Sequence, residues 1–363
     1  MQKKRRRGSK LLGIVGLHNK STFTQTGNID ATDLASVNII TKHANVEVTV
    51  HDAPNIVIRL HTYDGGPMLF VRRDGAVGHI TAHSEETMLF SNTLTTARLQ
   101  VTVPKNSDLS WDVQTSSGNM TIEELSGENI NLAVQSGDIF FRKADFQNVR
   151  VKTTTGEIKG LDLAMEELRI ETSSGDVRLN KITGNTWVKT NAGDIDVVDM
   201  EGDRIDLQSA SGDIDMVNVS VQQAFSQTAS GDIEAKDMFA TKLMTIASSG
   251  DMVFQSFTGK AMGHSSSGDI RFILSENGAL DLETSSGDIT VRFEFAEVDA
   301  HVTIGTSSGK INTTLPLQID EQKQLTKQRS GVIGNGTNAI RLASSSGDIR
   351  TFYSASNQKE PLV

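Results

Sequence analysis

The 363-residue sequence contains no cysteine, which excludes a disulfide framework and a thiolate metal site. This absence fits a cytosolic protein, and it fits equally well an exported one that is stabilised by repetitive hydrogen bonding. Only five prolines occur beside 31 glycines, which is typical of a folded chain with many turns. No apolar stretch approaches the roughly 20 residues that a membrane-spanning helix needs.

Positive charge is scarce except at the N-terminus. Lysine and arginine total 35 against 45 aspartates and glutamates, a net charge of −10. Six of the positive charges lie in the first ten residues, which contain no acid, so the rest of the chain carries 29 − 45 = −16. The six are Lys3, Lys4, Arg5, Arg6, Arg7 and Lys10. The acidic body argues against nucleic acid as a partner, whereas the basic end suits an anionic membrane surface.

The apolar run 11–17 follows these basic residues, an order that resembles the start of a signal peptide. The run is short, and no small-residue cleavage site follows it. We expect residues 1–20 to be a basic, flexible tail; a membrane-surface tether and an export signal are the alternatives.

One tetrapeptide, Ser-Gly-Asp-Ile, recurs along most of the chain. Its glycines lie 18 or 19 residues apart, except for a last step of 22. The series consists of Gly118, Gly137, Gly156, Gly175, Gly193, Gly212, Gly231, Gly250, Gly268, Gly287 and Gly309, and Gly331 and Gly347 continue it with looser spacing. A fixed short period indicates a solenoid, in which one small unit stacks on itself. We interpret the glycines as structural turn residues, because glycine accepts a positive φ and close packing against a neighbouring turn.

Apolar residues alternate with polar ones on both sides of each glycine, which is strand periodicity. The residue two positions after the glycine is always apolar, from Met120 and Ile139 to Ile349. About 19 residues per circuit suits neither a helical repeat nor a sandwich. The sequence therefore predicts an all-β fold, a single-stranded parallel β-helix (β-solenoid), whose identical positions stack about 4.8 Å apart.

The expected organisation has four parts: the tail at 1–20, irregular N-terminal coils and a cap at 21–112, regular coils at 113–352, and a C-terminal tail at 353–363. The segment 26–30 reads TGNID and copies the turn, so Gly27 would begin the first coil. Counting from there gives roughly 17 coils. Residues 62–98 and 315–329 blur the pattern and are expected to form hairpins or loops.

The run 99–118, LQVTVPKNSDLSWDVQTSSG, followed by serial S-G-D-I turns, closely resembles a bacterial β-strand-repeat "putative adhesin" family, a domain of unknown function. The chain is also similar to the β-helical part of the daptomycin-sensing surface protein of Gram-positive cocci. The resemblance covers about residues 25–352. It implies an association with the cell envelope and with envelope-stress responses, and no enzymatic residues. The extra helical or transmembrane segments of many members are missing from this sequence.

The residue after the glycine is acidic in ten of thirteen repeats, and stacking would line these side chains up on the outside as an acid ladder. The ten are Asp138, Glu157, Asp176, Asp194, Asp213, Asp232, Asp251, Asp269, Asp288 and Asp348. Local hydrogen bonding in the turn is the favoured interpretation, and a calcium site is the alternative. His79 and His83 would be about 13 Å apart in a strand, too far for one ion. We expect no metal, cofactor or catalytic residues.

Three hypotheses about function remain. The first is a non-enzymatic adhesin-like or scaffold β-helix of the envelope, which binds an envelope component or a partner protein; a cytoplasmic or membrane-peripheral location is the alternative. The second is a polysaccharide lyase or hydrolase, which would need acids and a base to converge in one coil. The third is a filament that self-associates through its open ends, unless the N-terminal tail and residues 354–363 cap them.

Overall fold

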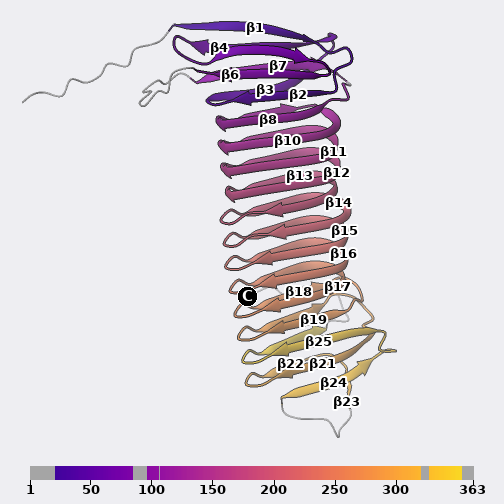
Figure 1. The fold of residues 1–363 in the computed structure, drawn as a ribbon. Helices are drawn as coiled ribbons and strands as arrows, with labels where there is room; N and C mark the ends of the chain where they lie inside the picture. The colour runs from indigo at the N-terminus through magenta and orange to yellow at the C-terminus, as the bar shows by residue number, and fades with distance from the viewer. Residues whose placement is uncertain (1–20, 85–95, 106, 320–326, 354–363) are drawn as a thin grey trace, which may run out of the picture.

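The computed structural model describes residues 21–84, 96–105, 107–319 and 327–353, and among them it contains strands and no helix. The strands stack one above another into a long parallel β-helix (Figure 1). Successive turns of the chain lie 18 or 19 residues apart, as in the pairs Ile139–Ile158 and Val177–Ile195. The predicted fold class is therefore confirmed.

The regular part of the stack begins at β8 and contains the longest strands. They are β8 (Ser110–Ser117), β9 (Met120–Glu123), β10 (Ser126–Ser136), β11 (Ile139–Thr155), β12 (Ile158–Ser174), β13 (Val177–Lys189), β14 (Ile195–Gln208), β15 (Ile214–Thr228), β16 (Ile233–Ala247), β17 (Met252–Ser265), β18 (Ile270–Leu274), β19 (Leu280–Thr284) and β20 (Ile289–Phe293). From β11 to β17, each strand runs from just after one glycine almost to the next, so each strand makes nearly a whole coil.

The core consists of columns of identical positions. The residues two positions after the glycines pair in register, for example Ile195 with Ile214 and Ile214 with Ile233, and their side chains are buried. Five positions before the glycines, Val151, Ile170 and Val188 form a second buried column. Both columns were expected from the alternation of apolar and polar residues, and each added coil extends them by one residue.

Close stacking, more than backbone conformation, explains the glycines. At Gly212 an added Cβ would overlap the carbonyl oxygen of Gly193, and the same overlap with the preceding glycine recurs along the stack. The φ angle lies in the left-handed region only at Gly118, Gly137 and Gly156 among these corners. Any larger residue would therefore push two coils apart, because the atom it meets belongs to the backbone.

A second corner, six residues after each glycine, was not recognised from the sequence. One non-glycine residue per coil has a positive φ there, between 51° and 59°. These residues are Glu124, Lys143, Asp162, Lys181, Asp199, Asn218, Asp237 and Ser256. Several contact the coil above, as when Lys143 Nζ lies 3.1 Å from Glu124 Oε1. The signal was present as a period-19 row of mostly charged or amide residues.

The N-terminal end departs from the predicted coils. It contains β1 (Thr22–Asp30), β2 (Ser36–Thr41), β3 (Ala44–His51), β4 (Asn55–Tyr63), β5 (Met68–Asp74), β6 (Val77–His83) and β7 (Ala97–Pro104). The prediction of a turn at Gly27 is wrong, because residues 22–30 form one strand that pairs antiparallel with β4. The coil formed by β2 and β3 lies between β6–β7 and β8–β9.

The C-terminal end is also out of sequence order. It contains β21 (Ala300–Thr306), β22 (Ile311–Thr313), β23 (Gln318–Ile319), β24 (Gln328–Ile333), β25 (Asn338–Ser344) and β26 (Ile349–Tyr353). Strands β25 and β26 insert between β19–β20 and β21–β22, so Gly347 stacks between Gly287 and Gly309. Gly331 was wrongly placed in the series, because it lies in β24, which pairs antiparallel with β21. Twelve glycines stack, so the estimate of about 17 coils was too high.

Candidate functional site: a groove beside the glycine corners

The acid ladder is held by backbone hydrogen bonds between coils. In most coils, one carboxylate oxygen of the residue after the glycine accepts a hydrogen bond from the backbone N–H of the equivalent residue in the next coil. Asp213 Oδ1 accepts from Asp232 N–H and Asp232 Oδ1 from Asp251 N–H, each at 2.8 Å. Asn119 Oδ1 accepts from Asp138 N–H at 3.0 Å, so a neutral amide fills the same position. The contact therefore needs an acceptor and not a charge.

Basic residues two positions further on neutralise the ladder in some coils. Arg178 pairs with Glu157, with Asp176 at 3.2 Å and with Asp196 at 3.0 Å. Arg350 does the same near the C-terminal end, at 2.8 Å from Asp288 and 2.9 Å from Asp348. These side chains reach sideways because equivalent positions of neighbouring coils lie one strand spacing apart.

The central coils, residues 193–251, carry acids instead at that position. Asp196, Asp215 and Glu234 stand beside the ladder residues Asp194, Asp213 and Asp232, which makes two parallel rows of carboxylates. Within the described residues, no lysine or arginine forms an ion pair with any of these six except Arg178 with Asp196. Burial raises the pKa of Asp215, and the neighbouring Asp196, Glu234, Asp213 and Asp194 raise it further.

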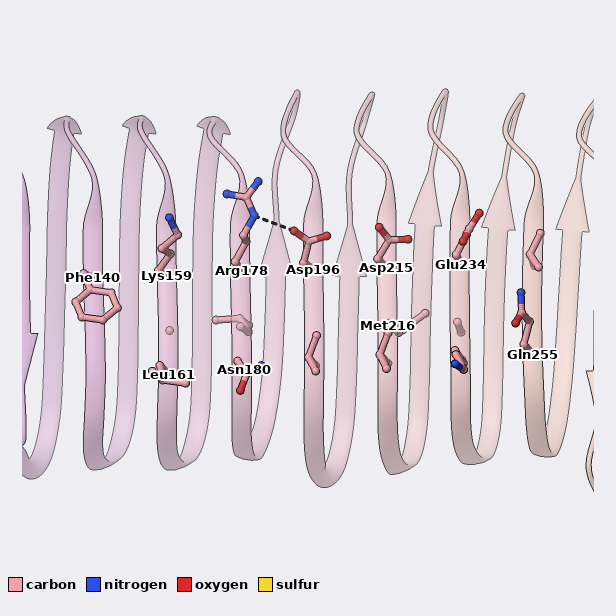
Figure 2. Close-up of a pocket in the computed structure, with 17 residues that line it drawn as sticks. Phe140, Lys159, Leu161, Arg178, Asn180, Asp196, Asp215, Met216, Glu234 and Gln255 are labelled. Atoms are coloured by element: carbon pink, nitrogen blue, oxygen red, sulfur yellow. Dashed lines mark hydrogen bonds and ion pairs between the residues drawn. The ribbon is translucent and has the colours of Figure 1, made fainter.

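These residues border a groove of about 680 Å³ on the outer face of the strands that follow the glycines. Figure 2 shows Lys159, Arg178, Asp196, Asp215 and Glu234 in a row, one in each successive coil. The opposite side of the groove is more apolar and includes Leu161, Val198 and Val217. The groove crosses seven coils, from Phe140 to Val253. It can hold an elongated ligand that lies along the axis of the β-helix.

The structure brings the predicted site residues into two adjacent lines. The corner glycines Gly118 to Gly287 stack directly, and the acids Asp138, Asp176, Asp194, Asp213, Asp232, Asp251, Asp269 and Asp288 stand next to them. Their structural role stays a prediction that a variant must test. Sequence reasoning missed the second acid row, although its period of 19 was visible in Asp196, Asp215 and Glu234.

Other candidate sites are weaker in the described part of the chain. His79 and His83 both lie in strand β6, and His83 stacks on Phe70 with ring centroids 4.8 Å apart. No group of three or more histidine, aspartate or glutamate side chains is placed to hold a metal ion in residues 21–84, 96–105, 107–319 and 327–353. Over the same ranges, no helix has the length and apolarity to cross a bilayer. The expected tails at 1–20 and 354–363 lie outside the described residues.

Sequence and fold together define the class: a β-solenoid built from corner-glycine coils. The chain belongs to the Toastrack DUF4097 family, whose profile matches residues 28–204 and 188–351. The predicted resemblance to an adhesin-like repeat family of unknown function is thus confirmed at the level of the family. No curated protein matches the chain.

Solved structures with related coils are distant in sequence. A "putative cell adhesion protein" from Clostridium sporogenes is 7% identical with a TM-score of 0.21, and the match covers 92% of this chain and 100% of that one. A "putative adhesin" from Bacteroides fragilis is 11% identical with a TM-score of 0.24, covering 92% and 98%. A "putative lipid binding protein" from Parabacteroides distasonis is 15% identical with a TM-score of 0.26, covering 90% and 96%. Identities and TM-scores this low say nothing about function.

Proposed function

We propose that this chain is a non-catalytic, adhesin-like scaffold of the bacterial cell envelope that binds an envelope component or a partner protein along its coils. The observation that carries the proposal is the groove of about 680 Å³, which continues across seven coils. Equivalent positions recur in every coil, so weak contacts to a long partner add through effective concentration. The envelope location and a role in envelope stress rest on the resemblance of run 99–118 and the serial turns to envelope-associated proteins.

The arrangement of the acids favours binding over catalysis. Catalysis needs one pre-organised constellation of acid, base and stabilising groups. Here the corner carboxylates are spread one per coil, and those of Asp194 and Asp213, for example, accept backbone hydrogen bonds. The ends of the stack also argue against a filament, because β1 and β24 each pair antiparallel with the neighbouring strand. Parallel end-to-end stacking of two molecules would need a bare coil at each end.

Graded removal of coils tests the proposal. Deleting residues 213–231 removes one complete repeat of 231 − 212 = 19 residues, and deleting 194–250 removes three. Each truncated chain and the full chain are mixed with an envelope fraction from cells that lack the protein, and co-sedimentation is measured. We expect binding to weaken in steps with the number of coils removed. An abrupt loss on altering a single coil, or release of soluble glycan, would favour the polysaccharide lyase or hydrolase instead.

The membrane-surface contact predicted for the basic N-terminus concerns residues 1–20, outside the described ranges, and stays a prediction. Adding vesicles that contain anionic lipid to the same sedimentation assay separates this contact from binding by the coils. Loss of vesicle binding after neutralising Lys3, Lys4 and Arg5, with envelope binding unchanged, would assign the two contacts to different parts of the chain.

A further inference from the structure

The charges along the groove change sign in a fixed order. Toward the N-terminal end of the stack the row begins with Lys159 and Arg178, and it continues with Asp196, Asp215 and Glu234. Asp215 and Glu234 have neither an ion pair nor a hydrogen bond within the described residues. Two unpaired carboxylates beside the half-buried Val198 and the exposed Val217 suit a ligand that is both cationic and partly apolar.

The described chain begins on the same face of the same sheet. Thr24 pairs with His61, His61 with Arg98, and Arg98 with Asn45. Asn45 Oδ1 in turn accepts a hydrogen bond from Asn119 N–H, which is the head of the acid ladder. Strand β1 therefore starts directly above the ladder, at the top of the face that holds the groove (Figure 1).

The segment before residue 21 has the matching charge. Residues 1–20 include seven lysines and arginines and no acid, and the apolar run 11–17 separates Lys20 from the other six. Read backward from residue 21, the order is one basic residue, an apolar run, and then the basic cluster 3–10. Along the face downward from β1, the half-buried Leu161 and the basic pair Lys159 and Arg178 precede the acids.

The length of the segment also matches. Strand-to-strand steps from β1 to β14, which carries Asp196, number eight: β1, β4, β7, β3, β9, β11, β12, β13, β14. At about 4.8 Å per step, β14 lies about 38 Å and β16 about 48 Å below β1. An extended chain spans about 3.4 Å per residue, so Lys10 reaches about 37 Å and Lys3 about 60 Å from residue 21. The cluster 3–10 brackets the acids.

We propose that the basic cluster 3–10 of this chain docks into its own groove against Asp196, Asp215 and Glu234, with the run 11–17 over the apolar part. This contact goes beyond the scaffold role, because it needs no outside partner. It makes the groove self-occupied, so an external ligand must displace the segment before it binds there.

Distance measurement on the full chain tests the docking. Because the sequence has no cysteine, Ser9→Cys and Gln255→Cys provide the only two sites for nitroxide labels. Gln255 lines the groove three coils beyond Asp196. Pulsed electron spin resonance at low salt is expected to give one narrow, short distance distribution. Salt near 0.5 M should broaden it, because screening shortens the range of the attraction.

Matched variants separate the groove from net charge. Asp215→Asn with Glu234→Gln is expected to lower the docked-to-free ratio about tenfold, from roughly 1 kcal/mol per charge removed at contact distance. Asp145→Asn with Glu128→Gln removes the same two charges from exposed positions outside the groove and should leave the distribution unchanged. Asp215→Lys with Glu234→Lys should abolish docking, and adding Arg6→Glu and Arg7→Glu should restore it.

Each other outcome overturns the proposal. A broad distribution in the parent chain at low salt means that the segment does not dock. An equal effect of both neutral pairs means that only net charge acts. A short distance that disappears when labelled chains are diluted with unlabelled ones assigns the segment to a second copy. Ordering that needs vesicles of phosphatidylglycerol and ignores Asp215 and Glu234 assigns it to the membrane.

Discussion

The central coils (residues 193–251) and the C-terminal coils (residues 280–353) have the same corner and opposite surroundings. In both, the residue after the glycine accepts a backbone N–H from the next coil, at 2.8 Å from Asp232 to Asp213 and 2.7 Å from Asp348 to Asp288. Two positions further on, Arg350 neutralises the C-terminal pair, whereas Asp215 and Glu234 add unpaired charge in the centre. Corner geometry and surface charge are thus set by different positions of one repeat.

The largest expected effect concerns what the two regions share. Gly212→Ala in the centre and Gly347→Ala near the C-terminal end should each destabilise the fold by about 3 kcal/mol or more, because each added Cβ meets a backbone carbonyl. Chemical denaturation followed by circular dichroism measures the change. Gly305→Ala is the control: nothing lies within 4 Å of its Cβ, so its effect should stay within about 0.5 kcal/mol. Equal behaviour of all three variants would refute the stacking explanation.

The next effect tests the neutralised region alone. Arg350→Gln leaves Asp288 and Asp348 without their cation and should cost about 0.5–1 kcal/mol, discounted because the arginine side chain is 37% exposed. Arg271 occupies the same position in another coil without an ion pair, so Arg271→Gln should change little. The free energy of unfolding at low and high salt distinguishes them, and an Arg350→Gln effect that salt does not reduce would contradict an electrostatic origin.

The unneutralised region should respond in the opposite direction. Changing Asp213, Asp232 and Asp251 together to Asn keeps the acceptor oxygens and removes three repelling charges. Stability should fall by less than about 0.5 kcal/mol, or rise at low salt. Calorimetric titration with calcium accompanies the unfolding measurement. Stoichiometric calcium uptake by the parent chain that is lost in the triple variant would show that the ladder is a metal site.

The smallest effect should depend on pH. Burial and then the neighbouring acids raise the pKa of Asp215 in the folded chain. The folded state therefore holds this proton at pH values where the unfolded chain, with a pKa of about 3.9, has released it. Stability is lost as the pH rises through that window, so Asp215→Asn should stabilise slightly at pH 7 and make no difference near pH 3. Melting temperatures at both values check this, and a larger gain at pH 3 would reverse the assignment.

The regular coils could be predicted because their rules are local. Alternation around each glycine placed Ile195, Ile214 and Ile233 inside, and the constant period placed them in one column. The corner was also legible, although most of its glycines are required by close approach and not by a positive φ. The second corner escaped notice because Lys143 and Asp162 are ordinary surface residues whose left-handed φ angles the sequence does not mark.

The ends could not be predicted, because a repeat motif does not say which strand it will pair with. The segment TGNID at 26–30 copies a corner in sequence, yet it lies inside β1, where it pairs antiparallel with β4. Gly331 lies at a similar spacing to the true corners and falls in antiparallel β24. In both cases the pairing partner comes from a distant part of the chain, so the local sequence carries too little information.

The sequence by itself determined the coil, its inward columns, its glycine corner and the excess of acid, because each depends only on residues within one period. The tertiary structure decided the order of the stack, in which Gly347 lies between Gly287 and Gly309. It also decided which charges meet: Arg178 lies against Asp196, and Arg350, 62 residues from Asp288 in the chain, lies against that carboxylate. Stacking turns a separation of one period or more into a single strand spacing, and only the folded chain fixes which periods become neighbours.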